Sequence, residues 1–125
     1  MTAEQLAGFF VGWPNPPSPE THLRLLHESD HVVLAIDTEN GSVVGFITAI
    51  SDGVLCAYLP LLEVLPECQK QGVGSELMRR MMAKLDGLYM IDLVRAENLG
   101  PFYERFGLIP ADAMVIRNFA RQSGR

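Results

Sequence analysis

The stretch of chain that most constrains the fold runs from residue 61 to residue 80, LLEVLPECQKQGVGSELMRR. Apolar residues crowd positions 54–65, which predicts a buried strand, and Gly72 and Gly74 then predict a short loop. Beyond the loop, apolar residues recur at helical spacing as far as Leu85. The segment therefore predicts a strand, a glycine loop and a helix in direct succession.

A junction of this kind is suited to binding an anion. The first N–H groups of a helix have no partner within the helix, and the helix dipole places partial positive charge at the same end. Because Gly72 and Gly74 carry no side chain, a phosphate can approach the main chain closely. The junction therefore predicts a site for a cofactor that carries phosphate groups.

The spacing of the glycines excludes two other phosphate-binding loops. A Walker loop needs four residues between its glycines and then Lys followed by Ser or Thr, whereas one residue separates Gly72 from Gly74. The dinucleotide fingerprint needs a third glycine three positions after the second, and Leu77 stands there instead. Neither of these loops is therefore expected.

The segment around the glycines resembles the loop of a known enzyme family. Residues 69–74, QKQGVG, fit the Gln/Arg-x-x-Gly-x-Gly/Ala loop of the GNAT superfamily of acetyl-CoA-dependent N-acetyltransferases. In that family a hydrophobic strand ending in Val-x-Pro precedes the loop, as residues 64–66, VLP, do here. Downstream, Asn98 and residues 102–107, FYERFG, match an Asn followed by an aromatic-Tyr-x-x-x-Gly segment. The resemblance covers roughly residues 1–118.

The resemblance implies an α/β (α+β) fold with a mixed, mostly antiparallel central sheet flanked by helices. Two central parallel strands of such a fold splay apart and form the acyl-CoA site. The length of 125 residues predicts one domain, residues 1–125. Family members usually begin with a strand, whereas this chain opens on a predicted helix. The sheet edge beside residues 31–37 is therefore expected to stay open, be covered, or pair with a second chain in a homodimer.

Two helices are predicted near the start of the chain. A capping box of Thr2 and Gln5 predicts a helix over about 3–11. Ser18 is the expected N-cap of the next helix, with Pro19 at its first position. The second helix is expected to turn an apolar face inward, formed by Leu23, Leu26 and His27.

The loop between these helices holds Trp13. In the family, the two helices and their loop border the acceptor site, so Trp13 either shapes that site or anchors the core. The identity of the acceptor is set by loop shape around residues 8–20 and by the C-terminal strands. The spacing of residues in these segments does not identify the acceptor.

An antiparallel meander is predicted for the next third of the chain. Its strands are 31–37, 42–50 and 54–65, with turns at Asn40-Gly41 and Asp52-Gly53. The last of these strands is apolar on both faces, as expected at the centre of a sheet covered on each side.

The remaining elements follow the central helix. Residues 89–94 predict a strand parallel to 54–65, because a helix connects the two. Residues 97–106 predict a helix that Gly107 ends, and residues 108–119 are left for terminal strands.

Composition excludes several classes of partner. A net charge of −5 argues against nonspecific nucleic-acid binding and suits a cationic substrate. No apolar stretch is long enough to span a bilayer and the N-terminus lacks signal-peptide features, so we expect a cytoplasmic protein without a membrane partner. His22, His27 and His31 show no metal-ligand spacing with other residues, so no metal is expected.

The resemblance implies which residues bind acetyl-CoA. The main chain at Leu62 and Val64 pairs with the pantetheine arm, and an N–H between residues 62 and 64 stabilises the oxyanion. Asn98 hydrogen-bonds the same arm, although a plain helix N-cap explains it nearly as well. Phe102 belongs to the matched downstream segment. Amides from Gln71 to Ser75 surround the diphosphate. The alternative is an ordinary strand-to-helix turn. The loop residues are Gln69 and Lys70 on the rim, then Gln71, Gly72, Val73, Gly74 and Ser75.

Two residues are candidates for proton transfer. Glu63 is the only charged residue between Asp52 and Glu67, and a carboxylate in so apolar a run suits a general base. The alternative is a Glu at a strand end turned to water, and a water molecule can relay the proton in either geometry. Tyr103 is the expected general acid by resemblance, or else a core Tyr packed between Phe102 and Phe106.

These residues predict an enzyme that transfers an acetyl group from acetyl-CoA to the primary amine of a small-molecule acceptor by direct attack. One alternative acceptor is the amine of a protein or peptide. The other alternative is a CoA-binding regulatory module without catalysis.

Overall fold

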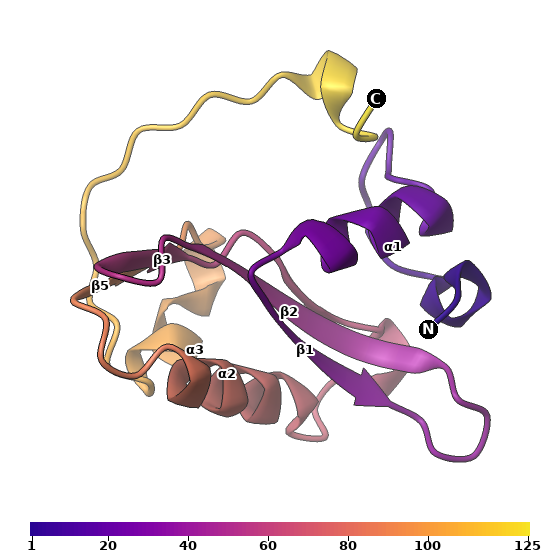
Figure 1. Ribbon diagram of the computed structural model, residues 1–125, viewed down its shortest axis with the longest axis horizontal. Coiled ribbons are helices and arrows are strands. Elements are labelled where there is room, and N and C mark those ends of the chain that lie inside the picture. The colour runs from indigo at the N-terminus through magenta and orange to yellow at the C-terminus, as the bar shows by residue number, and fades with distance from the viewer.

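The structure, a computed structural model, describes residues 1–125, and Figure 1 shows a small sheet with helices on both faces. The strands are β1 (His31–Ile36), β2 (Val43–Ser51), β3 (Cys56–Tyr58), β4 (Leu62–Val64) and β5 (Met90–Asp92). The α-helices are α1 (Pro19–Glu28), α2 (Val73–Lys84) and α3 (Gly100–Glu104). Short 3₁₀ helices are η1 (Ala3–Leu6), η2 (Pro66–Cys68), η3 (Glu97–Leu99) and η4 (Phe119–Arg121).

The sheet is mixed and mostly antiparallel, which confirms the predicted fold. Its order is β1-β2-β3-β5, and β4 also pairs with β2. Only β3 and β5 are parallel, and α2 lies between them in the chain. Strand β2 is therefore the centre of the sheet, with β3 and β4 placed one after the other along one of its edges.

The expected single strand over residues 54–65 is wrong, because the chain is broken between β3 and β4. Pro60 stands in the break, and proline has no N–H with which to continue a ladder. Strand β5 pairs with β3 alone, and the Leu59 N–H donates to the Asp92 oxygen at 2.9 Å. Beyond that point β4 and β5 diverge, as expected for splayed strands.

Each face of the sheet has its own hydrophobic core. Gly45 allows α2 to pack closely, because a Cβ there would lie 3.1 Å from the Leu77 side chain. The core under α2 contains Ile47, Ala49, Ala57, Leu59, Leu77, Met78, Met81 and Leu85. The core under α1 and η1 contains Leu6, Phe10, Leu26, Val43 and Phe46.

The two N-terminal helices differ from the predictions in length and facing. Ser18 caps α1 as expected, since its Oγ accepts from the Thr21 N–H at 3.1 Å. The helix predicted over 3–11 shrinks to η1, because the chain leaves helical geometry and Phe10 adopts a φ of 63°. In α1 the buried histidine is His22, and the prediction that His27 faces inward is wrong.

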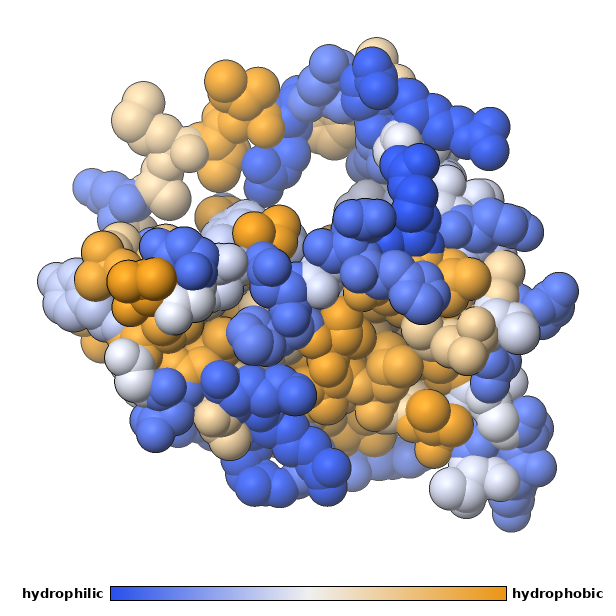
Figure 2. Space-filling view, in the orientation of Figure 1, coloured by the Kyte–Doolittle hydropathy of each residue, from blue (hydrophilic) through white to orange (hydrophobic).

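The terminal strands predicted over 108–119 are also wrong. No helix or strand forms between the end of α3 and the start of η4. This segment crosses from the β5 side of the molecule to α1, and the space-filling view leaves an opening beneath it (Figures 1 and 2). Its far end is held where the Asn15 N–H donates to Gln122 Oε1 at 3.0 Å. The apolar pattern alone was insufficient because a strand needs a paired neighbour.

The outer edge of the sheet is formed by β1, which pairs with β2 alone. Hydrophobic side chains gather over this part of the molecule in Figure 2. None of the helices combines the length and the apolar composition required to cross a bilayer.

His22 is buried among aromatic rings without a polar partner. It is 1 % exposed, and its ring centroid lies 4.5 Å from that of Phe46, 4.8 Å from Phe10 and 5.4 Å from Phe9. Neither ring nitrogen has a hydrogen-bond partner. Burial lowers the pKa of His22 from 6.5 to about 4, so the folded protein keeps this ring neutral.

The free energy of unfolding should therefore fall on acidification. Below pH 6.5 the unfolded chain binds a proton on His22 that the folded chain excludes until about pH 4, so stability is lost across this interval. The total loss is expected to be about 3 kcal/mol. Urea unfolding of wild type and His22→Phe at several pH values measures it, and the variant should show a flatter dependence.

His27→Gln is the matched control, because His27 is exposed on the same helix. That variant should keep the wild-type pH dependence. Equal slopes for wild type and His22→Phe would show that His22 does not cause the acid sensitivity.

Candidate active site

The glycine loop leaves the first amides of α2 open. Gly72 is the N-cap residue with a φ of 83°, a conformation that favours glycine, and no side chain caps the helix. The first bond of the helix runs from the Glu76 N–H to the Gly72 oxygen at 3.0 Å. The N–H groups of residues 73–75 therefore have no partner within the helix and can bind an anion.

A cavity of about 480 Å³ adjoins these amides. A Cβ on Gly74 would meet Phe102 at 3.7 Å and Val64 at 3.8 Å, so the glycine faces this cavity. Gln71 and Asn98, also predicted to bind the cofactor, do not line it. The predicted residues that do line it are Leu62, Val64, Gln69, Lys70, Gly72, Val73, Gly74, Ser75, Phe102 and Tyr103.

Arg105 is a residue of this cavity that the sequence prediction missed. Its Nη2 donates to Ser75 Oγ at 2.7 Å, which joins the C-terminal end of α3 to the first turn of α2. The guanidinium lies over the rings of Phe102 and Phe106, 5.2 and 5.6 Å from their centroids. A fixed positive charge thus stands beside the open amides. The available signal was its position three residues after Phe102, which places both on one helical face.

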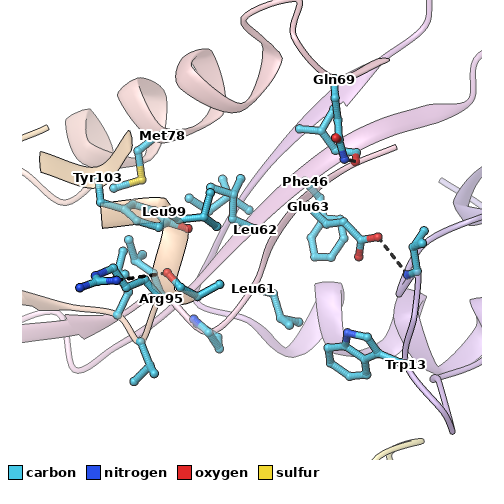
Figure 3. Close-up of a pocket in the computed structure, with 18 of the residues that line it drawn as sticks. Trp13, Phe46, Leu61, Leu62, Glu63, Gln69, Met78, Arg95, Leu99 and Tyr103 are labelled. Atoms are coloured by element: carbon cyan, nitrogen blue, oxygen red, sulfur yellow. Dashed lines mark hydrogen bonds between the residues drawn. The ribbon is translucent and has the colours of Figure 1, made fainter. Parts of the chain in front are cut away.

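A second cavity, of about 570 Å³, lies further along β4 (Figure 3). Trp13, Leu61 and Glu63 line one part of it, and Arg95 and Tyr103 line another. The two cavities share lining residues and therefore adjoin each other. The shared residues are Leu62, Val64, Gln69, Leu99 and Tyr103.

The backbone of β4 faces the gap between the splayed strands at every second residue. The Leu65 N–H donates to the Val44 oxygen at 2.9 Å and the Leu61 oxygen accepts from the Thr48 N–H at 3.0 Å. By the alternation of an antiparallel ladder, the amide groups of Leu62 and Val64 then point away from β2. Gln69 Nε2 donates to the Val64 oxygen at 3.0 Å. An extended ligand can pair with this edge once the Gln69 side chain moves aside.

The Glu63 carboxylate is held by the N-terminal segment. Its Oε1 accepts from the Phe10 N–H at 2.9 Å and its Oε2 from the Val11 N–H at 3.3 Å. These bonds direct it toward the part of the cavity that Trp13 lines (Figure 3). Glu63 is thus a fixed, half-buried hydrogen-bond acceptor at the cavity rather than a strand-end residue in open water.

Tyr103 lies on the other side of Leu62 from Glu63 (Figure 3). It lines both cavities, and its ring meets that of Phe102 edge-on with centroids 5.0 Å apart. Burial raises the pKa of Tyr103 above its ordinary value of 10.0. The phenol therefore keeps its proton at neutral pH and can act as a proton donor.

The comparisons with known proteins agree with this geometry. The model of the acetyltransferase (GNAT) family matches residues 1–108. The chain belongs to the GNAT acetyltransferase family. The resemblance to this family that the sequence shows is thereby confirmed, and the protein is an enzyme of the acyltransferase class. No curated protein matches the chain by sequence.

Solved structures of GNAT proteins show the same fold. A Deinococcus radiodurans R1 protein assigned as an acetyltransferase is 50 % identical, with a TM-score of 0.95 over 98 % of this chain and 85 % of its own. A GNAT-family acetyltransferase from Streptococcus pneumoniae TIGR4 is 28 % identical, with a TM-score of 0.76, over 94 % and 92 % of the two chains. Glucosamine-6-phosphate N-acetyltransferase from Arabidopsis thaliana, at 14 % identity and a TM-score of 0.68 over 95 % of each chain, shares the fold.

One alternative for the GNAT site is overturned. Asn98 lies within η3, while Ala96 caps η3 and Leu99 caps α3, so the explanation of Asn98 as a helix N-cap is wrong. The predicted helix over 97–106 is in fact η3 followed by α3. The Asn98 side chain is exposed outside both cavities.

Replacing Glu63 by Ala should destabilise the GNAT fold. The Phe10 N–H lies in a residue that is 4 % exposed, and without the carboxylate it would lack its partner. We expect the free energy of unfolding to fall by about 1–3 kcal/mol, measured by urea denaturation. Glu63→Gln should lose less, because its remaining oxygen still accepts from Phe10. Glu67→Ala removes an exposed carboxylate nearby and should match wild type; an equal loss in that control would contradict the role of these bonds.

Proposed function

We propose that the protein transfers an acetyl group from acetyl-CoA to the primary amine of a small molecule by direct attack, without a covalent enzyme intermediate. The observation that carries the proposal is the pair of adjoining cavities along β4. One contains the open amides of α2, and the other contains the Glu63 carboxylate and the Tyr103 phenol. An anion site and groups for proton transfer thus lie along the same strand.

The loop and the strand edge fit the two polar parts of coenzyme A. The amides of residues 73–75 and the Arg105 guanidinium suit the diphosphate. The backbone of Leu62 and Val64 suits the pantetheine arm, which pairs like an added strand. In this arrangement the Gln69 amide leaves the Val64 oxygen when the arm enters. A free N–H of β4 then stabilises the oxyanion of the acyl group.

Transfer requires one proton to leave the amine and one to reach the sulfur. Glu63 accepts the amine proton, directly or through one water molecule, as the nitrogen bonds to the acyl carbon. When the carbon–sulfur bond breaks, the Tyr103 phenol donates its proton to the thiolate. Acetyl-CoA supplies the activated acyl group, and the enzyme returns to its starting state once Tyr103 regains a proton and Glu63 loses one.

Binding of acetyl-CoA should depend on the open end of α2. Gly74→Asp places a negative charge at the amides, so the affinity for acetyl-CoA should fall at least about tenfold. Isothermal calorimetry measures the dissociation constant, and thermal stabilisation by acetyl-CoA provides a second readout. Ala83→Asp, exposed at the other end of the same helix, is the matched control and should bind like wild type. Undiminished binding by Gly74→Asp would remove the loop from the cofactor site.

The chemical step should depend on Glu63 and Tyr103. Release of free thiol from acetyl-CoA, measured with a panel of small amines and peptides, should fall roughly 10²-fold in kcat for Glu63→Gln, because the proton acceptor is lost. Tyr103→Phe should lower kcat about tenfold or more across the pH range, because the phenolic donor is lost. Both variants should bind acetyl-CoA like wild type.

The same assay separates the proposed reaction from its alternatives. Wild-type turnover in Glu63→Gln or Tyr103→Phe would exclude that residue from proton transfer. Preferential turnover of peptides would identify a protein acceptor. Binding of acetyl-CoA without thiol release for any amine would identify a regulatory module.

A further inference from the structure

The part of the second cavity around Glu63 is lined by large apolar side chains. Phe46 is fully buried at its base, and Leu61 lines its wall. Val11 and Trp13 stand at its mouth, 59 % and 37 % exposed. Trp13 packs against Phe10, with ring centroids 4.8 Å apart, which fixes one face of the indole and leaves part of it open. Such exposed apolar surface beside a cavity suits the apolar part of a ligand.

Charge at this end of the cavity is only negative. The charged residues of the lining are Glu63 and Arg95. Figure 3 places Arg95 on the opposite side from Trp13, beyond Leu61. Arg95 Nη1 already donates to the Ala96 and Glu97 oxygens at 3.2 and 2.8 Å. A phosphate or carboxylate on the acceptor would therefore find no cation among the residues that line this end of the cavity.

The Glu63 carboxylate has capacity for a further donor. Each of its oxygens accepts one amide, from Phe10 and from Val11. An ionised carboxylate offers about four lone-pair positions, so others remain for an ammonium group. An amine held there would place its carbon body against Trp13 and Leu61, since these side chains border the same part of the cavity.

Resting on the acetyl transfer proposed above, we infer that the acceptor is a primary amine with an apolar, aromatic body and no acidic group, of the phenylalkylamine type. The ammonium pairs with Glu63, loses one proton to solvent to become the neutral amine, and gives a second proton to Glu63 as the nitrogen bonds to the acyl carbon. The ring packs against Trp13. An acidic substituent is rejected because it would be desolvated near Glu63 without a compensating charge. The acceptor thus differs in class from the phosphorylated sugar named for the Arabidopsis structure.

Trp13 itself reports on the acceptor, because it is the only tryptophan of the chain. With the enzyme saturated with CoA, titration with phenethylamine should change the indole fluorescence in a saturable manner. Phenylalanine, which differs by one carboxylate, should bind at least about tenfold more weakly, and so should glucosamine 6-phosphate. Equal or tighter binding of either acidic compound would overturn the inference.

A kinetic experiment tests the role of the ring. Trp13→Ala should raise the KM for phenethylamine about tenfold while the dissociation constant of acetyl-CoA stays unchanged. Tyr89→Ala is the matched control, because Tyr89 is an aromatic residue that is 81 % exposed and lies outside this cavity. An unchanged KM in Trp13→Ala would exclude Trp13 from the acceptor site.

The two readouts separate this inference from the proposed reaction. A fluorescence response to phenethylamine with no thiol release for any amine would refute acetyl transfer, while supporting an apolar aromatic amine as the ligand of this cavity. Acetyl transfer to other amines, with no response to phenethylamine, would refute the acceptor class alone.

Discussion

The structure depends on the pairing of β4 with a single neighbour. Strand β2 holds one edge of β4, while β5 follows β3 and leaves the other edge facing a gap. Helix α2 packs beneath this arrangement and presents its open amides at the end of the same strand. One discontinuity in the sheet thus produces both an unpaired strand edge and the cavities that border it. Because the break follows from Pro60, a local feature of the backbone determines where a ligand can bind.

The Glu63 carboxylate ties the N-terminal segment to this strand. Its bonds to the Phe10 and Val11 amides position the loop that carries Trp13, so the Trp13 wall of the second cavity and the proposed base are fixed by the same contacts. The two amide bonds also give an acidic side chain hydrogen-bond partners within an otherwise apolar run. The backbone that Glu63 holds also orients the Glu63 carboxylate, so no further element is needed to position it. The shape of the site is therefore coupled to the folding of residues 3–13.

The sequence was most informative where local rules determine structure. The glycine loop, the capped start of α1 and the helix that follows Gly72 formed as predicted, because caps, turns and helical periodicity act over a few residues. The pairing of strands in the sheet was harder to predict from the sequence. Residues 54–65 and 108–119 both carry strand-forming residues, yet the first is interrupted and the second finds no neighbour in the sheet. Arg105 reaches Ser75 across the fold, and the burial of His22 rather than His27 depends on how α1 is rotated on the sheet.

The contact between Gln69 and Val64 has a consequence for the unpaired edge of β4. An unpaired strand edge is a template on which another chain can add a strand, which leads to aggregation. The Gln69 amide donates to the Val64 oxygen, so one acceptor of that edge is already satisfied within the chain. The edge of β4 therefore offers one main-chain acceptor fewer to a foreign strand, and a ligand that pairs with the Val64 oxygen exchanges one hydrogen bond for another.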